Sequence, residues 1–413
     1  MKFPEPKTFR GAISPTILFN WTFGCGIFEF PTGHPRPFLS LLWSSIHFVV
    51  YLSSCFSIVR IPVLPELRHT PLIKYYYYIN SCFGTIFTIT SMVSARRIQM
   101  LRNFNHRITK INKNLQTTLG IPEHYGEAFR WNLAQLFVAF IKIVIIVIAS
   151  GIFIVDAQYF SLIIFWISRF YQMIFILTLV CTYCGLIRYT GNRFQQLNAH
   201  ILQLTFGDSE TKPCLQSLNR SEFSPLSPIV YEIHGDLRLA KAADIRRKVY
   251  VLREVRTIHH ELRIATEEIN RVFGTQLVFV MGMSIYNIIS LLFGLYVTLT
   301  STTMFHSFRH DYLFFSLSWL SFFLIVVFYV VHCSSTVSDE AQKIGKLMYE
   351  VAQRSHETEM QDEINAFSIQ LLKNPLKLTA NGLFVLDYKM ICAMGGLVST
   401  YLVILIQMYS VNN

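Results

Sequence analysis

The stretch Thr400-Tyr401-Leu402-Val403-Ile404-Leu405-Ile406-Gln407 ends the last long apolar run of the chain. A segment of this kind predicts a membrane-spanning helix, because a helix satisfies its own backbone hydrogen bonds in hydrocarbon. The Gln407 amide is costly there unless it faces protein or water. Gln407 follows Tyr401 by six positions, a rotation of roughly 600° at 3.6 residues per turn, so the two side chains lie on different faces. We expect one face to contact a neighbouring helix and the other to face a polar lumen.

The composition of the whole chain is that of a membrane protein. Of its 413 residues, 52% are hydrophobic and 15% are charged, and the mean hydropathy is +0.39. Soluble domains carry about 25% charged residues. We therefore expect an all-α, polytopic membrane protein.

Seven apolar runs approach the ~20 residues that a bilayer core requires. They predict spans at 38–59, 72–95, 133–155, 159–187, 273–299, 312–335 and 385–409. The predicted organisation is an N-terminal segment (1–37), four spans (38–187), a partly disordered linker (188–237, rich in Ser, Pro and Gly over 206–236), the fifth and sixth spans with extensions (238–372), and the last span (373–413).

Lysine and arginine are distributed unevenly between the two sides of this arrangement. Most lie in the N-terminal segment, 96–131, 188–272 and 336–384, and few lie in the connections on the other side. The positive-inside rule then places the N-terminus in the cytoplasm and the C-terminus outside. This orientation argues against the G-protein-coupled receptors, whose N-terminus is outside. The net charge of +11 is explained by cytoplasmic loops near anionic lipid, without a nucleic acid partner.

A helical pattern continues beyond two of the spans. From about Leu239 to Phe273, apolar residues recur every three or four positions without a proline, which predicts one rod continuous with the fifth span. The sixth span continues in the same way through Val351, and a short helix is expected near 363–372. The apolar stripe of these rods packs either within one subunit or in a base shared between subunits, and the pattern leaves both alternatives open.

Motifs for catalysis or metal binding are absent from the sequence of the spans. No paired carboxylates, histidine cluster or nucleophile motif lies within a span, so we expect neither an enzyme nor a cofactor. Cys181 and Cys184 lie in an apolar run, where burial explains them better than metal or redox chemistry. His259-His260-Glu261 lacks the second histidine of a zinc protease helix, and we expect it on a solvated face.

Arg169 is the most informative charge within a span. On a helix it shares a face with Trp166 and Gln172, and a polar group flanked by aromatic rings can orient a small molecule. The alternative is a structural hydrogen bond to a backbone carbonyl or to Asp156. Lys142 is expected to snorkel to the cytoplasmic interface. Further ligand-binding candidates, all neutral and in the outer halves of their spans, are Tyr78, Asn80, Tyr286, Asn287, Ser290 and Trp319.

The last span is the candidate pore helix. Gly395 and Gly396 permit close approach of another helix. Beyond Thr400 the stretch around Ile404 is aliphatic. A narrow apolar lumen closed by Gln407 and Met408 would gate by excluding water.

The Thr400-Tyr401 pair, five hydrophobic residues and Gln407 resemble the C-terminal signature of insect gustatory receptors, in which Phe usually stands at the place of Met408. Ala380-Asn381-Gly382-Leu383-Phe384 and Val272-Phe273-Gly274 are also similar to this family. The resemblance implies a tetrameric ligand-gated cation channel with seventh helices around the pore, ligand in the outer halves of the other spans, and a cytoplasmic anchor. It implies inter-helix contacts for Thr400 and Tyr401 and a place at the gate for Gln407 and Met408, where methionine is more flexible than phenylalanine.

The same resemblance implies a tastant as ligand, either a sugar or a bitter plant metabolite, which the sequence does not distinguish. It also implies a homotetramer or a heteromer with related receptors, in the cell membrane of gustatory neuron dendrites. The alternatives are an odorant-receptor-like channel subunit, which would share the architecture, and a multi-span transporter of a small organic solute. No internal repeat or pair of broken helices supports the transporter.

The predicted orientation can be tested at two glycosylation sequons. Asn20-Trp21-Thr22 and Asn219-Arg220-Ser221 both lie on segments expected in the cytoplasm, so neither asparagine should carry a glycan. The measurement is the electrophoretic shift of the expressed protein after glycosidase treatment. A shift that Asn20→Gln or Asn219→Gln abolishes would overturn the orientation.

Overall fold

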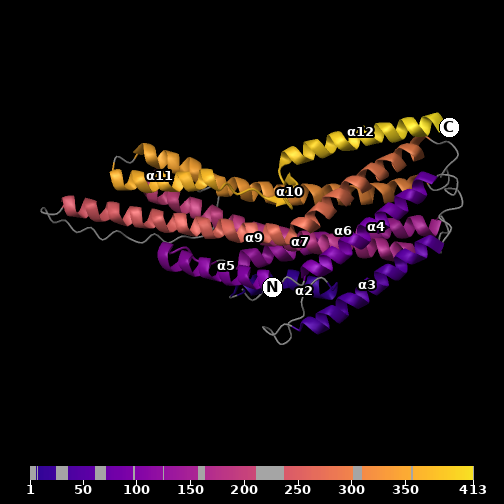
Figure 1. The fold of residues 1–413 in the computed structure, drawn as a ribbon, viewed down its shortest axis with the longest axis horizontal. Helices are drawn as coiled ribbons and strands as arrows, with labels where there is room; N and C mark the ends of the chain where they lie inside the picture. Colours follow the sequence, from indigo (N-terminus) through magenta and orange to yellow (C-terminus); the bar gives the residue numbers. More distant parts are fainter. Residues whose placement is uncertain are drawn as a thin grey trace.

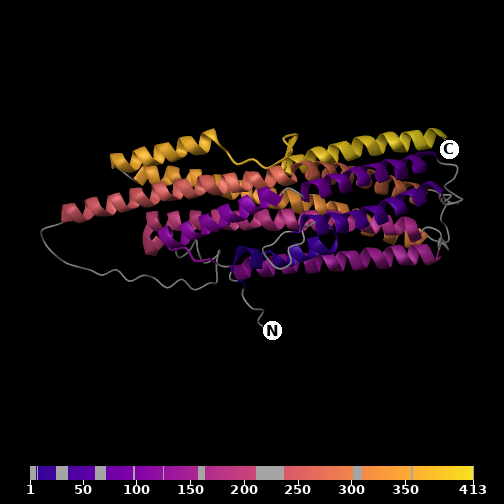
Figure 2. The ribbon, with the colours of Figure 1, turned by 60° about the horizontal axis from the view of Figure 1, so that its bottom comes forward.

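The structure, a computed structural model, describes residue 6 and residues 8–24, 36–60, 71–95, 98–123, 125–156, 163–210, 237–300, 309–354 and 357–412. Almost all of these residues are helical, and the helices lie along one long axis (Figures 1 and 2). In chain order they are α1 (Phe9–Ala12), α2 (Ser14–Thr22), α3 (Pro37–Arg60), α4 (Pro71–Ala95), α5 (Ile98–Leu119), α6 (Tyr125–Asp156), α7 (Ile163–Glu210), α9 (Leu237–Thr300), α10 (Arg309–Arg354), α11 (Thr358–Lys373) and α12 (Tyr388–Asn412).

The expected spans coincide with α3, α4, α6, α7, α9, α10 and α12. Within the described residues, α6, α7, α9, α10 and α12 are long and apolar enough to cross a membrane. The helices α3 and α4 have 24 and 25 residues, or about 36 Å at 1.5 Å per residue. The helical, polytopic fold class is therefore confirmed. The last span begins at Tyr388 rather than at 385, and residues 159–162 lie outside the described ones.

Two helices continue far beyond the spans, as expected. Helix α9 is unbroken over 64 residues and α10 over 46, because no proline interrupts either run. Helix α7 also continues to Glu210, so the prediction that a linker begins at residue 188 was wrong. Residues 211–236 of the predicted linker lie outside the described part of the chain. These continuations, with α5 and α11, form the half of the molecule on the left of Figure 1. We call this half the extension, and the opposite end of the bundle, near the C-terminus, the distal end.

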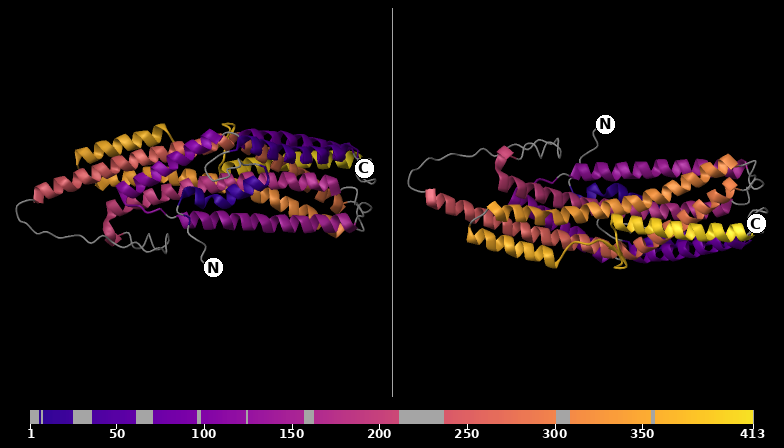
Figure 3. Two further views of the ribbon diagram at one scale, coloured as in Figure 1. Left: turned by 90° about the horizontal axis from the view of Figure 1, so that it is seen from below. Right: turned by 90° about the horizontal axis from the view of Figure 1, so that it is seen from above.

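The apolar stripe of the α9 rod is buried by the chain itself. Every member of this stripe has an exposed fraction of 5% or less, and the members are Leu252, Val255, Ile258, Leu262, Ala265 and Ile269. Helices α5, α7, α10 and α11 surround α9 there (Figure 3). The alternative of packing within one subunit is therefore correct for this stripe.

Helix α5 was not expected from the sequence. It buries Phe104, Ile108, Ile111 and Leu115, which are spaced by three or four positions. Its other face holds Arg107, whose guanidinium lies 2.7 Å from Glu261 and 3.2 Å from Glu268 on α9. The helix thus covers the extension with an apolar stripe and an ion-paired edge.

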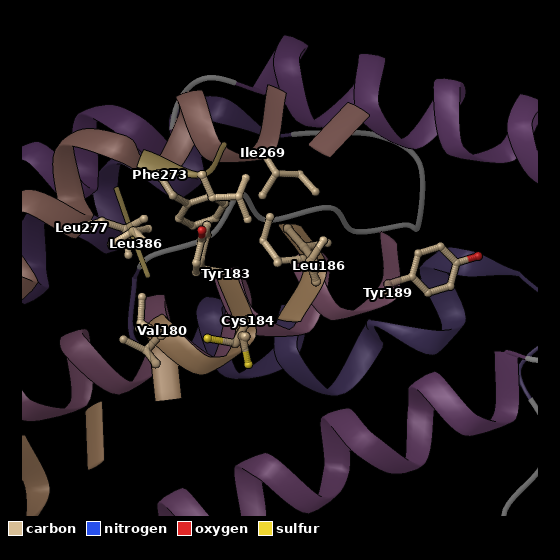
Figure 4. Close-up of a cluster of buried hydrophobic side chains, with 14 of the residues drawn as sticks. Val180, Tyr183, Cys184, Leu186, Tyr189, Ile269, Phe273, Leu277 and Leu386 are labelled. Atoms are coloured by element: carbon tan, nitrogen blue, oxygen red, sulfur yellow. The ribbon is translucent and has the colours of Figure 1, made fainter. Parts of the chain in front are cut away.

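The two N-terminal helices pack against α6 and α7. The ring of Phe9 lies 4.5 Å from that of Tyr189, and the Asn20 amide donates to the hydroxyl of Thr182 at 2.8 Å. Nearby, Cys181 and Cys184 are buried in the apolar interior as expected. Figure 4 shows Cys184 among the side chains of this core.

A short hairpin connects α11 to α12. Its strands are β1 (Thr379–Ala380) and β2 (Phe384–Val385), which pair antiparallel with Thr379 opposite Val385 and Ala380 opposite Phe384. The hairpin lies midway along the molecule, where α12 begins (Figure 1). The fold therefore departs from an all-helical chain at this single described place.

His259 is buried, so its expected place on a solvated face was wrong. Its side chain is 3% exposed, lies between the rings of Phe194 and Phe367, and is within 3.0 Å of the Ala341 carbonyl on α10. Burial lowers the pKa of His259 to about 4. The imidazole is therefore neutral in the folded protein at physiological pH.

Acid should weaken the extension through His259. Below pH 6.5 the unfolded histidine gains a proton that the folded one accepts only near pH 4, so stability present above pH 6.5 is lost as the pH falls between these values. The shift corresponds to about 3 kcal/mol. The measurement is the melting temperature of detergent-solubilised protein at pH 7.5 and pH 5. His259→Leu should show a smaller acid-induced drop than the wild type, whereas the exposed control His310→Gln should not. Equal drops in all three would contradict the assignment.

Candidate functional site

Helix α12 is the least buried of the five apolar spanning helices. Most of its side chains are exposed, and Gly396, Thr400, Ile404 and Gln407 are exposed residues that follow one another as a strip along one face. Thr400 and Gln407 are seven positions apart, or about two turns, and so lie on the same face. Met408 and Tyr401 flank this strip and are about half exposed. The candidate pore residues therefore share one side of the last helix.

The opposite side of α12 holds it to the bundle. Met394 is buried, and the ring of Tyr409 lies edge-on to Phe293 at 6.0 Å and to Tyr296 at 6.4 Å, both on α9. A Cβ added at Gly395 or Gly396 would meet nothing within 4 Å. The small size of these glycines is therefore not required by contacts within one chain.

Tyr401 is half exposed, at 51%. Thr400 satisfies its hydroxyl by donating to the Gly396 carbonyl at 2.9 Å. Both residues are exposed on α12, and their expected inter-helix contacts would be made with another subunit. They remain a prediction.

Three amides meet between α4, α7 and α9. The side-chain amide of Asn80 donates to Oδ1 of Asn287 at 3.3 Å. The side-chain amide of Asn287 donates to the backbone carbonyl of Met283 at 2.8 Å. The Gln172 amide lies 3.7 Å from the Met283 sulfur. All three amides are buried, and Oδ1 of Asn80 has no hydrogen-bond partner among the described residues. A buried acceptor without a partner is costly in the protein and suits a ligand's donor.

A second polar position lies on α10. Trp319 stacks on Phe170 of α7 at 6.3 Å and on Phe323 at 6.2 Å. Its indole nitrogen and the hydroxyl of the fully buried Ser316 have no hydrogen-bond partner within the described ranges. The two groups are three positions apart and on the same side of α10. Together they offer a donor and a hydroxyl in aromatic surroundings.

The other ligand-binding candidates are less enclosed. Tyr78 is 37% exposed, and Ser290 donates to the Tyr286 carbonyl at 2.9 Å. Tyr286 and Arg169 are half-buried. The side chain of Trp166 is outside the described ones, so the expected Arg169 face is not settled by these contacts. The structure thus brings Asn80, Gln172 and Asn287 together and packs Trp319 of α10 against Phe170 of α7.

Three contributors were not expected. Tyr51 and His47 on α3 lie against Tyr171 of α7, with ring separations of 6.3 and 5.5 Å. A Cβ added at Gly84 of α4 would lie 2.6 Å from the Gln172 amide nitrogen and also crowd the Tyr51 hydroxyl, so these side-chain ends would have to shift. A glycine or tyrosine within an apolar run gives no sign of its neighbour on a distant helix, and only the packing reveals it.

Lys142 does not point toward the extension, so the expected snorkelling was wrong. Its ammonium donates to the hydroxyl of Ser321 on α10 at 2.6 Å. Gln135–Tyr329 and Phe153–Phe315 contacts set the register of the antiparallel α6 and α10. In that register Ser321 lies on the distal side of Lys142. The described residues contain no group of three or more histidine, cysteine or acidic side chains able to hold a metal ion.

Comparison with known proteins gives consistent results. The model of the 7tm Chemosensory receptor family matches residues 17–412. The chain is similar to the Drosophila melanogaster "Gustatory receptor for sugar taste 43a", with 24% identity over 60% of this chain and 59% of that protein. It is also similar to "Putative gustatory receptor 28b" of the same organism, with 25% identity over 39% of this chain and 34% of that protein. These matches thus span about six tenths and one third of the two relatives.

The fold is similar to that of the insect olfactory receptor OR5 from Machilis hrabei. The structure of that receptor in complex with eugenol has a TM-score of 0.62, covers 97% of this chain and 98% of its own, and is 13% identical in sequence. A second structure of the same olfactory receptor also has a TM-score of 0.62, at 12% sequence identity. At this identity the likeness shows a shared fold.

Proposed function

Because the chain belongs to the 7tm Chemosensory receptor family, a family of receptors rather than enzymes, we propose that it is a gustatory receptor acting as a tastant-gated, non-selective cation channel. The observation that carries this proposal is the exposed strip of α12. A spanning helix with Thr400 and Gln407 exposed along one face needs another polar or protein surface in the membrane.

A pore between several subunits provides that surface. Around a fourfold axis, the strips from four α12 helices would face each other, with Thr400 and Gln407 supplying polar groups and Ile404 an apolar ring. The open space beside Gly395 and Gly396 supports close approach of neighbouring helices. The assembly is a homotetramer or a heteromer with related receptors.

Ligand would bind in the outer half of the bundle, between α4, α7, α9 and α10. Asn80, Ser316 and Trp319 supply neutral buried groups that lack partners among the described residues. Such groups favour an uncharged molecule with hydroxyl or carbonyl groups. A sugar fits this chemistry, and one relative is named for sugar taste; a neutral bitter plant metabolite is the alternative tastant.

We place the protein in the cell membrane, in the dendrites of gustatory neurons. The distribution of lysine and arginine puts the N-terminus and the extension in the cytoplasm and the distal end outside. The ligand-binding groups then lie in the outer leaflet, accessible to tastants.

An odorant-receptor-like channel subunit is the second candidate, favoured by the fold likeness to the olfactory receptor OR5. The sequence similarity to gustatory receptors favours the first candidate. Purified protein in a planar bilayer, challenged with sugars, bitter metabolites and volatile odorants, distinguishes them by which class evokes current. A protein without evoked current for any class would contradict both.

Changes in the outer half should weaken ligand binding. Asn287→Ala and Arg169→Ala should raise the half-maximal ligand concentration by about one to two decades, because a lost buried polar contact costs about 1–3 kcal/mol. Dose–response curves of the evoked current measure this shift, with surface expression as a check. The exposed Tyr250→Phe on the extension is the control and should match the wild type. An unchanged curve for Arg169→Ala would return Arg169 to a structural role.

Changes at the end of α12 should alter conduction directly. Met408→Ala widens and wets the constriction and should raise current without ligand, whereas Gln407→Leu extends the apolar ring and should suppress current. Cysteines introduced at 407 and 408 should react with charged thiol reagents from outside, faster with ligand present. If both cysteines are unreactive in both states and neither substitution changes current, α12 does not line the pore.

A further inference from the structure

The hairpin before α12 has a tight and demanding turn. Asn381 and Gly382 have φ values of 52° and 77°, as both central residues of a type I′ turn require. The Leu383 amide donates to the Ala380 carbonyl at 3.0 Å, and the Gly382 amide donates to the Thr379 hydroxyl at 3.1 Å. Asparagine and glycine are the residues that adopt such φ values at least cost. The turn therefore holds one defined shape.

The backbone of this turn packs closely against α9 at Gly274. A Cβ added at Gly274 would lie 3.0 Å from the Asn381 backbone nitrogen and 3.2 Å from its Cα. Those neighbours are backbone atoms of a constrained turn, so they cannot move aside as a side chain can. Only glycine allows the hairpin to sit this close to the helix. The two segments are more than a hundred positions apart in the sequence.

Side chains on both arms fix the hairpin further. Leu376, Leu378, Ala380 and Leu386 are almost completely buried. Figure 4 shows Leu386 beside Leu277 and near Phe273 of α9. The Leu386 amide also donates to the Leu378 carbonyl at 2.9 Å, which closes the hairpin at its base.

Helix α12 starts from this fixed base. Its first residue, Tyr388, follows Leu386 by two positions, and Asp387 caps the helix by accepting a hydrogen bond from the Met390 amide at 3.1 Å. Among the described residues of α12, Met394 is the one buried side chain. The extension-side end of α12 is thus held by the hairpin, while most of its length contacts little of its own chain.

Helix α9 also carries Met283 and Asn287 of the candidate ligand site. Asn287 lies about 20 Å from Gly274 along the same unbroken helix, at 1.5 Å per residue. One rigid element therefore bears both the ligand-side amide and the surface on which the base of α12 rests.

From these contacts we propose that Gly274 and Asn381 are positioning residues that set the resting tilt of the pore helix, an inference that rests on the proposed channel function. The docked turn fixes the extension-side end of α12 against α9. Movement of α12 on gating is then confined to the distal part, where Tyr409 meets α9. A purely structural role would affect the amount of folded protein, whereas a positioning role changes conduction in folded protein.

Three glycine substitutions separate these roles. Gly274→Ala crowds the backbone of Asn381, so the turn must shift by a few tenths of an ångström relative to α9. Gly382→Ala strains the turn through its positive φ, with nothing within 4 Å of the added Cβ. Gly282→Ala is the matched control, because it lies on the same helix α9 and its Cβ would also meet nothing within 4 Å. Purified protein in bilayers is measured for ligand-free current and dose–response, and hydrogen–deuterium exchange is measured over 376–390.

Gly274→Ala and Gly382→Ala should each raise ligand-free current about tenfold, because misplaced α12 helices cannot converge as closely. The half-maximal ligand concentration should stay near that of wild type, and exchange over 376–390 should increase. Gly282→Ala should match the wild type in every measurement. The positioning role is overturned if folded Gly274→Ala and Gly382→Ala both match Gly282→Ala in current and exchange, or if they lower only the yield of folded protein. Absence of evoked current in the wild type would instead contradict the proposed channel function. The exchange data would still show whether the hairpin is held against α9.

Discussion

The need to satisfy every backbone hydrogen bond inside a membrane determines most of this structure. It forces the spans to be helices, and three of them continue without interruption into the extension. Helices α7, α9 and α10 are therefore single rigid rods of 48, 64 and 46 residues. One continuous helix, α9, therefore carries Asn287, Gly274 and the buried stripe of the extension.

Features governed by local sequence could be predicted. The apolar runs gave the spans, and the spacing of Leu252 to Ile269 gave the α9 rod, since both depend on residues within a few turns of each other. The shared face of Thr400, Ile404 and Gln407 could be predicted in the same way, whereas their role in a pore remains a prediction. Their places along one helix follow from spacing alone, and the structure leaves these residues of α12 exposed.

Features governed by contacts between distant segments could not be predicted. Gly274 and Asn381 were noticed as separate motifs, but only the fold brings the turn onto the helix. The same holds for Gln172 against Gly84 and for His259 between Phe194 and Phe367. A polar residue in a helical pattern can be solvated or satisfied by a distant partner, and the pattern is identical in the two cases. Arg169 illustrates the limit, because its helix face was identified but its role was not.

The uneven burial of the chain is itself a functional argument. In the extension, α5 and α11 cover the apolar stripe of α9 and add ion pairs to it, among them Arg107 with Glu261 and Arg256 with Glu363. The last helix is held at its base by the hairpin and contacts α9 through the Tyr409 ring near its distal end, and its outward residues include Gly396, Thr400 and Gln407 beside exposed aliphatic side chains. Hydrocarbon is a poor environment for that strip. A spanning helix that is anchored at its base and exposes Thr400 and Gln407 along one face is consistent with the proposed assembly, in which the lumen would be formed between subunits and not within one of them.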